Sequence, residues 1–213
     1  MSITAEQLNR VMPSAADLLS DEPEMESELH YLQLMALYSS LARYWRERSD
    51  YFIGANLTVY YSREQLRSRD FRGPDLFVVT GVEKRTRNSW VVWEEGGRYP
   101  DLIIELLSDS TAEIDRTIKR DLYAGRFRTP EYFWFSPQTA EFAGFQLTGG
   151  SYQEIPADDR GWRWSGVLNL YLGIKDQQLR YFTREGDLVP TPDEAADRLA
   201  AKLRELGINP DEI

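Results

Sequence analysis

The chain contains no cysteine among its 213 residues, and histidine occurs only once, as His30. Without cysteine it can form no disulfide, no thiol nucleophile and no thiolate metal site, a composition typical of a cytoplasmic protein. The histidine lies between Leu29 and Leu32 in an expected helix, where a packing or surface role is more common than catalysis. We therefore expect a cytoplasmic protein whose chemistry rests on other side chains.

Long apolar runs are also missing. No uninterrupted apolar stretch reaches the roughly 18 residues that a membrane-spanning helix needs. The segment from Met1 to Leu19 lacks the basic start and apolar centre of a secretory signal. The chain is nevertheless 42% hydrophobic and 13% aromatic, which predicts a folded globular protein with a substantial core. We expect no membrane partner.

An excess of basic charge is absent as well, because 35 acidic residues outnumber 25 basic ones and give a net charge of −10. Neutralisation of phosphates supplies most of the non-specific affinity for nucleic acid, so this balance disfavours such binding. A role on nucleic acid would need a divalent metal or a local basic patch. Arg69 and Arg72, in a charged segment before Asp75, are candidates for phosphate contacts, although a solvated loop explains them equally well.

The pattern of apolar residues predicts helices at both ends of a series of strands. Residues 24–48 carry apolar side chains at helical spacing, and residues 195–206 read as an amphipathic helix. A third helix is expected from about Thr111 to Gly125, with Ile114, Ile118 and Leu122 on its apolar face. Strands are expected at 52–61, 75–80, 102–107, 131–135, 141–147, 152–155, 162–164, 168–174 and 179–183.

This order of elements predicts an α+β or mixed α/β fold in a single domain, 1–213. Within it we expect four segments and prefer to read the meander as an extension of the same sheet. The segments are an N-terminal arm at 1–22, a core at 24–137, an antiparallel β meander at 138–190 and a C-terminal helix at 192–207.

Glu105 is the most informative residue of the core, because it lies alone among branched aliphatic residues in the expected strand 102–107. A buried carboxylate is costly without a cation beside it. From Glu105 to the end of the strand is about 10 Å at strand rise, and from the next helix start to Lys119 is about 12 Å at helical rise. A helix that folds back over its strand would therefore bring Lys119 level with Glu105.

These residues lie in a block that resembles a known family. Two Pro-Asp pairs open apolar runs at Asp75 and Asp101, and the block continues through Asp115-Arg116, Lys119, Tyr123 and Pro130-Glu131-Tyr132. This arrangement resembles the bacterial Uma-type restriction endonuclease family of the PD-(D/E)XK nuclease superfamily. The resemblance is specific over 73–137 and looser elsewhere. It implies a restriction-endonuclease-like core in which a central mixed sheet is flanked by helices.

The resemblance implies that Asp75 and Glu105 hold a metal ion and that Lys119 is the catalytic lysine. In the superfamily pattern the lysine lies two residues beyond the glutamate, where this chain has Leu107, so Lys119 corresponds to a lysine moved onto the following helix. Asp109 stands where the family often has proline. Glu28 on the first helix is a possible accessory residue. Asp101 is another, although a structural role suits it better.

The implied activity is Mg²⁺- or Mn²⁺-dependent hydrolysis of nucleic-acid phosphodiester bonds, with DNA as the preferred and weakly bound substrate. Two converging carboxylates also predict a raised pKa for at least one of them, and we expect this of Glu105. The alternative function is a catalytically silent nuclease-like scaffold that binds or assembles proteins, which the acidic charge favours. The oligomeric state stays open, with a homodimer as one candidate.

Overall fold

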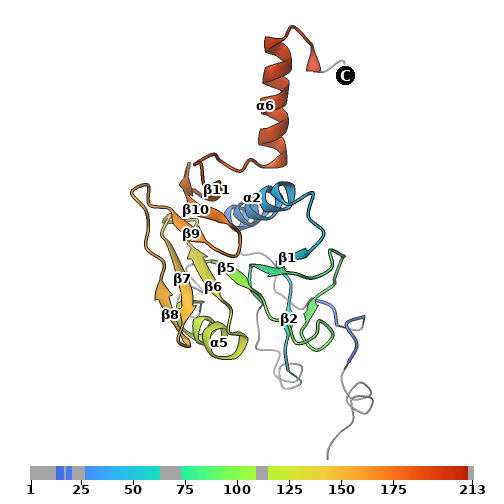
Figure 1. Cartoon of the computed structure of the whole chain (residues 1–213), viewed down its shortest axis with the longest axis vertical. Coiled ribbons are helices and arrows are strands. Elements are labelled where there is room, and N and C mark those ends of the chain that lie inside the picture. The colour runs from blue at the N-terminus through green and yellow to red at the C-terminus, as the bar shows by residue number, and fades with distance from the viewer. Residues whose placement is uncertain (1–12, 17, 21–26, 63–72, 109–114, 211–213) are drawn as a thin grey trace, which may run out of the picture.

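The centre of the molecule is a mixed six-stranded sheet (Figure 1), seen in a computed structural model that describes residues 13–16, 18–20, 27–62, 73–108 and 115–210. The strands lie in the order β1-β3-β5-β6-β7-β8, and β5 and β6 run parallel whereas the other neighbours are antiparallel. Their bounds are β1 Tyr51–Ala55, β3 Leu76–Thr80, β5 Leu102–Leu106, β6 Glu131–Phe135, β7 Phe142–Thr148 and β8 Ser151–Glu154.

The long helix α2 (Glu28–Tyr44) covers one face of this sheet. It begins at Glu28, because the side chain of Ser27 accepts a hydrogen bond from the backbone N–H of His30 and so caps the first turn. Leu34, Leu37 and Leu41 pack against the aliphatic side chains of β1, β3 and β5. The expected helix at 24–48 is present from Glu28, and residues 24–26 lie outside the described part of the chain.

A separate three-stranded sheet covers the other side of α2. It consists of β9 (Arg163–Ser165), β10 (Leu170–Lys175) and β11 (Gln178–Phe182) in the order β11-β10-β9. The side-chain amide of Gln33 on α2 exchanges two hydrogen bonds with the backbone of Leu179 on β11. The expected meander is therefore divided, because β7 and β8 extend the central sheet while β9–β11 enclose α2 from outside.

The last helix, α6 (Pro192–Glu205), projects from the body of the molecule (Figure 1). Thr191 and Glu194 form a reciprocal capping box at its start. Glu194 also accepts two hydrogen bonds from the guanidinium of Arg180 on β11, at 2.9 and 2.5 Å. This pair ties the start of the helix to the second sheet.

One expected strand, at 52–61, is two strands in the structure. Asn56 adopts a left-handed backbone conformation with φ of 48°, which ends β1 at Ala55. The chain then forms the short strand β2 (Val59–Tyr60), which pairs in parallel with β4 (Trp90–Val91) in a sheet of its own. The β-branched and aromatic residues on both sides favour a strand, and Gly54-Ala55-Asn56 between them is the sequence signal for the break.

The helical segment that follows β5 differs from a regular α-helix. A single α-turn, α5 (Arg120–Leu122), lies between two wider π-turns, η1 (Asp115–Lys119) and η2 (Tyr123–Phe127). Ile118 is 67% exposed, so its expected place on the apolar face is wrong, whereas Leu122 is partly buried against the second core as expected. The wider turns rotate the segment so that Tyr123 and Phe127 are buried instead.

The expected mixed α/β class, with a central mixed sheet and covering helix, is confirmed. One hydrophobic core joins α2 to both sheets, and a second core lies on the opposite face of the central sheet, around Tyr123 and Tyr132. Among the described helices, none combines the length and apolarity that crossing a membrane requires. The assignment of one domain, with its four segments, stays a prediction.

Candidate active site

The register of the central sheet brings Asp75 and Glu105 face to face. β3 and β5 are antiparallel, with Leu76 opposite Ile104, so the residue before β3 lies opposite the fourth residue of β5. Asp75 and Glu105 are thus cross-strand neighbours at the edge where β3 begins. The backbone N–H of Asp75 lies 3.4 Å from Oε2 of Glu105 and points to it as a donor.

Asp75 is held by two donors that come from different elements. Its Oδ2 accepts a hydrogen bond of 2.7 Å from the backbone N–H of Leu106, and its Oδ1 lies 3.0 Å from Nε2 of His30 at the start of α2. Burial raises the pKa of the Asp75 carboxyl, but the hydrogen bond with His30, the charge of Lys119 and the bond from Leu106 together hold it below the ordinary value. Asp75 is therefore a stable carboxylate.

Glu105 is completely buried, at 0% exposure, and two side chains of the following helical segment bind it. The ammonium of Lys119 lies 3.1 Å from Oε2, and the hydroxyl of Tyr123 donates a hydrogen bond of 2.7 Å to Oε1. Lys119 and Tyr123 are four residues apart, at the end of η1 and the start of η2, so one side of this segment carries both groups. The expectation that Lys119 would point at Glu105 is confirmed.

The geometry explains how a carboxylate is tolerated in the core. Isolated burial of an ion costs several kcal/mol, and the cost falls only when charge and hydrogen bonds compensate it. Glu105 has both, because Lys119 supplies the charge and Tyr123 a short neutral hydrogen bond. The side chain of Asp75 is 18% exposed and that of Lys119 is 13% exposed, so the cluster meets solvent on the side of these two residues.

Asp101 lies outside this cluster, at the far end of β5. Its Oδ2 accepts hydrogen bonds from the backbone N–H and the hydroxyl of Thr80, at 2.7 and 2.8 Å, where β3 ends. Asp75 and Asp101 thus lie at opposite ends of the same strand pair, and the structural interpretation of Asp101 fits its contacts. From this position the carboxylate of Asp101 cannot contact a metal ion held by Asp75 and Glu105.

The remaining candidate residues are not part of the cluster as described. Glu28 is exposed in the first turn of α2 and, among the described residues, makes no hydrogen bond or ion pair. Arg69 and Arg72 lie outside the described residues, so their expected phosphate contacts stay a prediction. The raised pKa expected of Glu105 also stays a prediction, although its burial is confirmed.

Sequence reasoning missed two members of the cluster. His30 was expected to pack or to lie on the surface, but it is buried and contacts Asp75. Its placement depends on α2 crossing the start of β3, which spacing within the helix cannot reveal. Tyr123 was noticed only as part of the family pattern. Its spacing of four residues from Lys119 was the available indication that both would face Glu105.

The two carboxylates are the groups of the cluster that could bind a hard divalent cation, because such ions prefer oxygen ligands with negative charge. Within the described ranges, no group of three or more histidine, aspartate and glutamate side chains converges in a metal-holding arrangement. Mg²⁺ commonly binds through one or two carboxylates and completes its coordination with water and substrate phosphate. Asp75 and Glu105 fit that mode, with water or backbone oxygens as further ligands.

A family model described as "putative restriction endonuclease" matches residues 18–194. Among solved structures, a putative nuclease from Anabaena variabilis ATCC 29413 matches at 13% identity and a TM-score of 0.49, and the match covers 83% of this chain and 97% of that one. No curated protein matches. The family match includes Asp75, Glu105 and Lys119, and it confirms the resemblance drawn from the sequence.

Proposed function

The chain belongs to the Uma2 family of putative restriction endonucleases, and from this premise we propose that it hydrolyses phosphodiester bonds of nucleic acid, with a divalent metal ion held by Asp75 and Glu105. The observation that carries the proposal is the pairing of these two carboxylates across β3 and β5, with Lys119 bound to Glu105 at 3.1 Å. The restriction-endonuclease-like fold agrees with this assignment.

The metal ion, when bound, polarises the phosphate and lowers the pKa of a water ligand. The protein contributes fixed positions for the two carboxylates. The Leu106 N–H and His30 orient Asp75, while Tyr123 and Lys119 orient Glu105. Such outer contacts fix the direction of ligand oxygens and are typical of metal sites.

Lys119 has a second role in this proposal, at the phosphate itself. Its side chain is 13% exposed, whereas Glu105 is fully buried, so the ammonium lies between the carboxylate and solvent. A substrate phosphate that approaches from solvent therefore meets Lys119 before it meets Glu105. There the ammonium would offset the negative charge that the phosphate oxygens carry during attack by water.

DNA is the substrate that we propose, bound weakly. The net charge of −10 opposes a polyanion over most of the surface, so binding should depend strongly on low ionic strength. A cytoplasmic location, from the absence of cysteine, and a homodimeric state are retained as part of this proposal.

The proposal is tested by cleavage of plasmid, single-stranded DNA and RNA at low ionic strength, with Mg²⁺, with Mn²⁺ and with chelator. Glu105→Gln and Asp75→Asn should abolish cleavage, because the amide keeps the shape but not the charge that holds a cation. Lys119→Ala should slow turnover with less effect on metal affinity. Asp176→Asn is the matched control, since this residue is 84% exposed in a turn with left-handed backbone that asparagine tolerates.

The alternative is a catalytically silent scaffold, and one observation favours it. All four carboxylate oxygens of Asp75 and Glu105 already have a protein group within hydrogen-bonding distance, so the cluster is satisfied without metal. Equal residual cleavage by the wild type and both carboxylate variants would indicate a contaminating nuclease. The scaffold function would then stand in place of the enzyme.

A further inference from the structure

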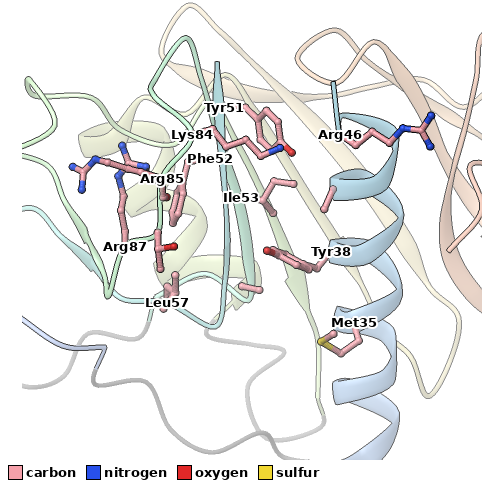
Figure 2. A pocket seen from close by; sticks show the side chains of 13 residues that line it. Met35, Tyr38, Arg46, Tyr51, Phe52, Ile53, Leu57, Lys84, Arg85 and Arg87 are labelled. Carbon is pink, nitrogen blue, oxygen red and sulfur yellow. Dashed lines mark hydrogen bonds between the residues drawn. The ribbon is translucent and has the colours of Figure 1, made fainter. Parts of the chain in front are cut away.

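A hollow of 610 Å³ lies between α2 and the edge strand β1 (Figure 2). Its floor is apolar and aromatic, with Met35 and Tyr38 from the helix facing Tyr51 and Ile53 from the strand. β1 is the outermost strand of the central sheet, and among the described residues no further strand covers this side. The volume is within the range of pockets that hold small organic ligands.

The lining carries positive charge in a strongly acidic protein. Four of its residues are cationic, Arg46, Lys84, Arg85 and Arg87, and none is acidic. Arg46 is paired with the neighbouring Glu47, and Arg85 and Arg87 share the single carboxylate of Glu95. Lys84 has no carboxylate partner among the described residues. This is the local basic patch that the acidic composition makes necessary for any contact with a polyanion.

The cations are placed along the aromatic surface. The ammonium of Lys84 lies 4.8 Å from the centre of the Tyr51 ring and donates to the carbonyl of Arg48 at 3.4 Å. Lys84 and Arg85 are exposed, whereas Arg87 is buried against Phe52 and Trp90. Lys84 and Arg85 can therefore contact a ligand, while Arg87 supports the wall.

The other end of the hollow lies where β1 ends. Ala55 and Leu57 line it, and the backbone N–H of Asn56 between them donates a hydrogen bond of 2.8 Å to the backbone carbonyl of Asp75. From Tyr51 to Ala55 is about 13 Å at strand rise. A ligand that lies along β1 from Lys84 would thus end one strand away from the backbone of Asp75.

We propose that this hollow binds a single-stranded segment of the nucleic-acid substrate, with phosphates on Lys84 and Arg85 and a base stacked on Tyr38. The identification of the ligand as substrate rests on the proposed function. Tyr38 is 37% exposed, so its ring is available for stacking. A duplex hides its bases, whereas unpaired bases stack on aromatic side chains while cations follow the backbone. An apolar floor with a cationic edge matches the second case.

The test is the binding of a fluorescein-labelled oligothymidine to the full chain, measured by fluorescence anisotropy with chelator present so that no cleavage occurs. Replacing Lys84 and Arg85 together by alanine should lower the slope of log affinity against log salt by about 1.4, from ~0.7 for each lost phosphate contact. The matched control replaces Lys175 and Lys202, two exposed lysines elsewhere, and should reproduce the wild-type slope. An oligouridine arm compares RNA with DNA.

Tyr38 provides an independent arm. Tyr38→Leu should weaken binding at least about fivefold, because stacking of a base on an aromatic ring is worth roughly 1–3 kcal/mol. Tyr38→Phe keeps the ring and should bind within about twofold of the wild type. Thermal unfolding of each variant confirms that the fold is kept.

Four outcomes would overturn the inference. The first is an equal loss of affinity in the alanine pair and in the control pair, which would mean diffuse electrostatic attraction. The second is an unchanged affinity of Tyr38→Leu, and the third is tighter binding of a duplex than of a single strand. The fourth is a change in the oligomeric state of the alanine pair without a loss of oligonucleotide binding, which would assign the edge of β1 to a second copy of the chain. If the variants lose binding as expected but the wild type cleaves no nucleic acid, the proposed function is refuted and the binding site along β1 still stands.

Discussion

Removing the ammonium of Lys119 while keeping its stem, in Lys119→Met, should destabilise the protein through the buried Glu105. In the structure this carboxylate is 0% exposed and lies 3.1 Å from the lysine nitrogen. Loss of one partner from a buried ion pair typically costs about 3–5 kcal/mol. Glu105 keeps the hydroxyl of Tyr123 and faces the N–H of Asp75, which offset part of that cost. We therefore expect a loss of about 2 kcal/mol in the free energy of unfolding.

Removing the charge of Glu105 instead should cost less free energy of unfolding. Glu105→Gln leaves a lysine whose side chain is 13% exposed and can turn its ammonium toward water, so we expect a loss of about 1 kcal/mol. In the double variant, with Lys119→Met and Glu105→Gln together, neither residue carries a charge that lacks its partner. Its loss should therefore be smaller than the sum of the single losses, with a coupling free energy of about 1–2 kcal/mol.

The assay is urea unfolding of the wild type, both single variants and the double variant, with chelator present and at neutral pH. Linear extrapolation gives the four free energies, and equal slopes show that the unfolded state is comparable. Additivity of the two single losses to within about 0.5 kcal/mol would refute the reasoning, because it would mean that the two charges do not depend on one another. Lys119→Met losing less than Glu105→Gln would refute it as well.

Three further predictions concern buried or partly buried carboxylates, and each is measured by urea unfolding across the acid range. The lowered pKa of Asp75 contributes stability that is present above its ordinary value of 3.8 and is lost as pH falls through the folded value, so Asp75→Asn should flatten the acid end of the stability curve. Burial raises the pKa of Glu131 above 4.5 despite hydrogen bonds from Ser165 and the N–H of Gly166, so wild-type stability should decline as pH rises through that value. Glu131→Gln, which can keep these partners, should remove the decline, whereas Glu131→Ala should lose about 2 kcal/mol. Arg180 lowers the pKa of Glu194 to about 2, so the stability from this pair should disappear as pH falls from 4.5 toward 2. Because the carboxylate is 37% exposed, Glu194→Gln should cost only about 1 kcal/mol at neutral pH, and no loss would contradict the role of the pair in holding α6.

The residues that the sequence could predict are those whose position follows from local rules. Glu105 stands out as one carboxylate in an apolar strand, and the antiparallel pairing of β3 with β5 places Asp75 opposite it. Lys119 was reached by comparing strand rise with helical rise, two lengths that are fixed by backbone geometry. The direction of Lys119 was therefore right although the helix around it was not regular.

What escaped prediction depends on contacts between distant elements or on departures from regular geometry. The wide turns of η1 and η2 moved the buried face from Ile118 to Tyr123, and no helical periodicity contains that information. The left-handed backbone of Asn56 ended the strand at Gly54-Ala55-Asn56, the part of this segment with the weakest strand preference. Both departures lie at the candidate site, since η2 brings the tyrosine to Glu105 and the backbone N–H of Asn56 donates to the backbone carbonyl of Asp75.

The charges of the cluster connect its stability with its proposed chemistry. With His30 neutral, Asp75 and Glu105 bring two negative charges and Lys119 one positive charge, which leaves one negative charge where β3 begins. A divalent cation together with one phosphodiester anion adds one positive charge, so the complete assembly would be neutral. The cation alone would overcompensate and the phosphate alone would be repelled. Metal and substrate should therefore bind more tightly together than separately. Chelation should weaken the binding of a phosphate at the carboxylate cluster without affecting oligonucleotide binding in the hollow along β1.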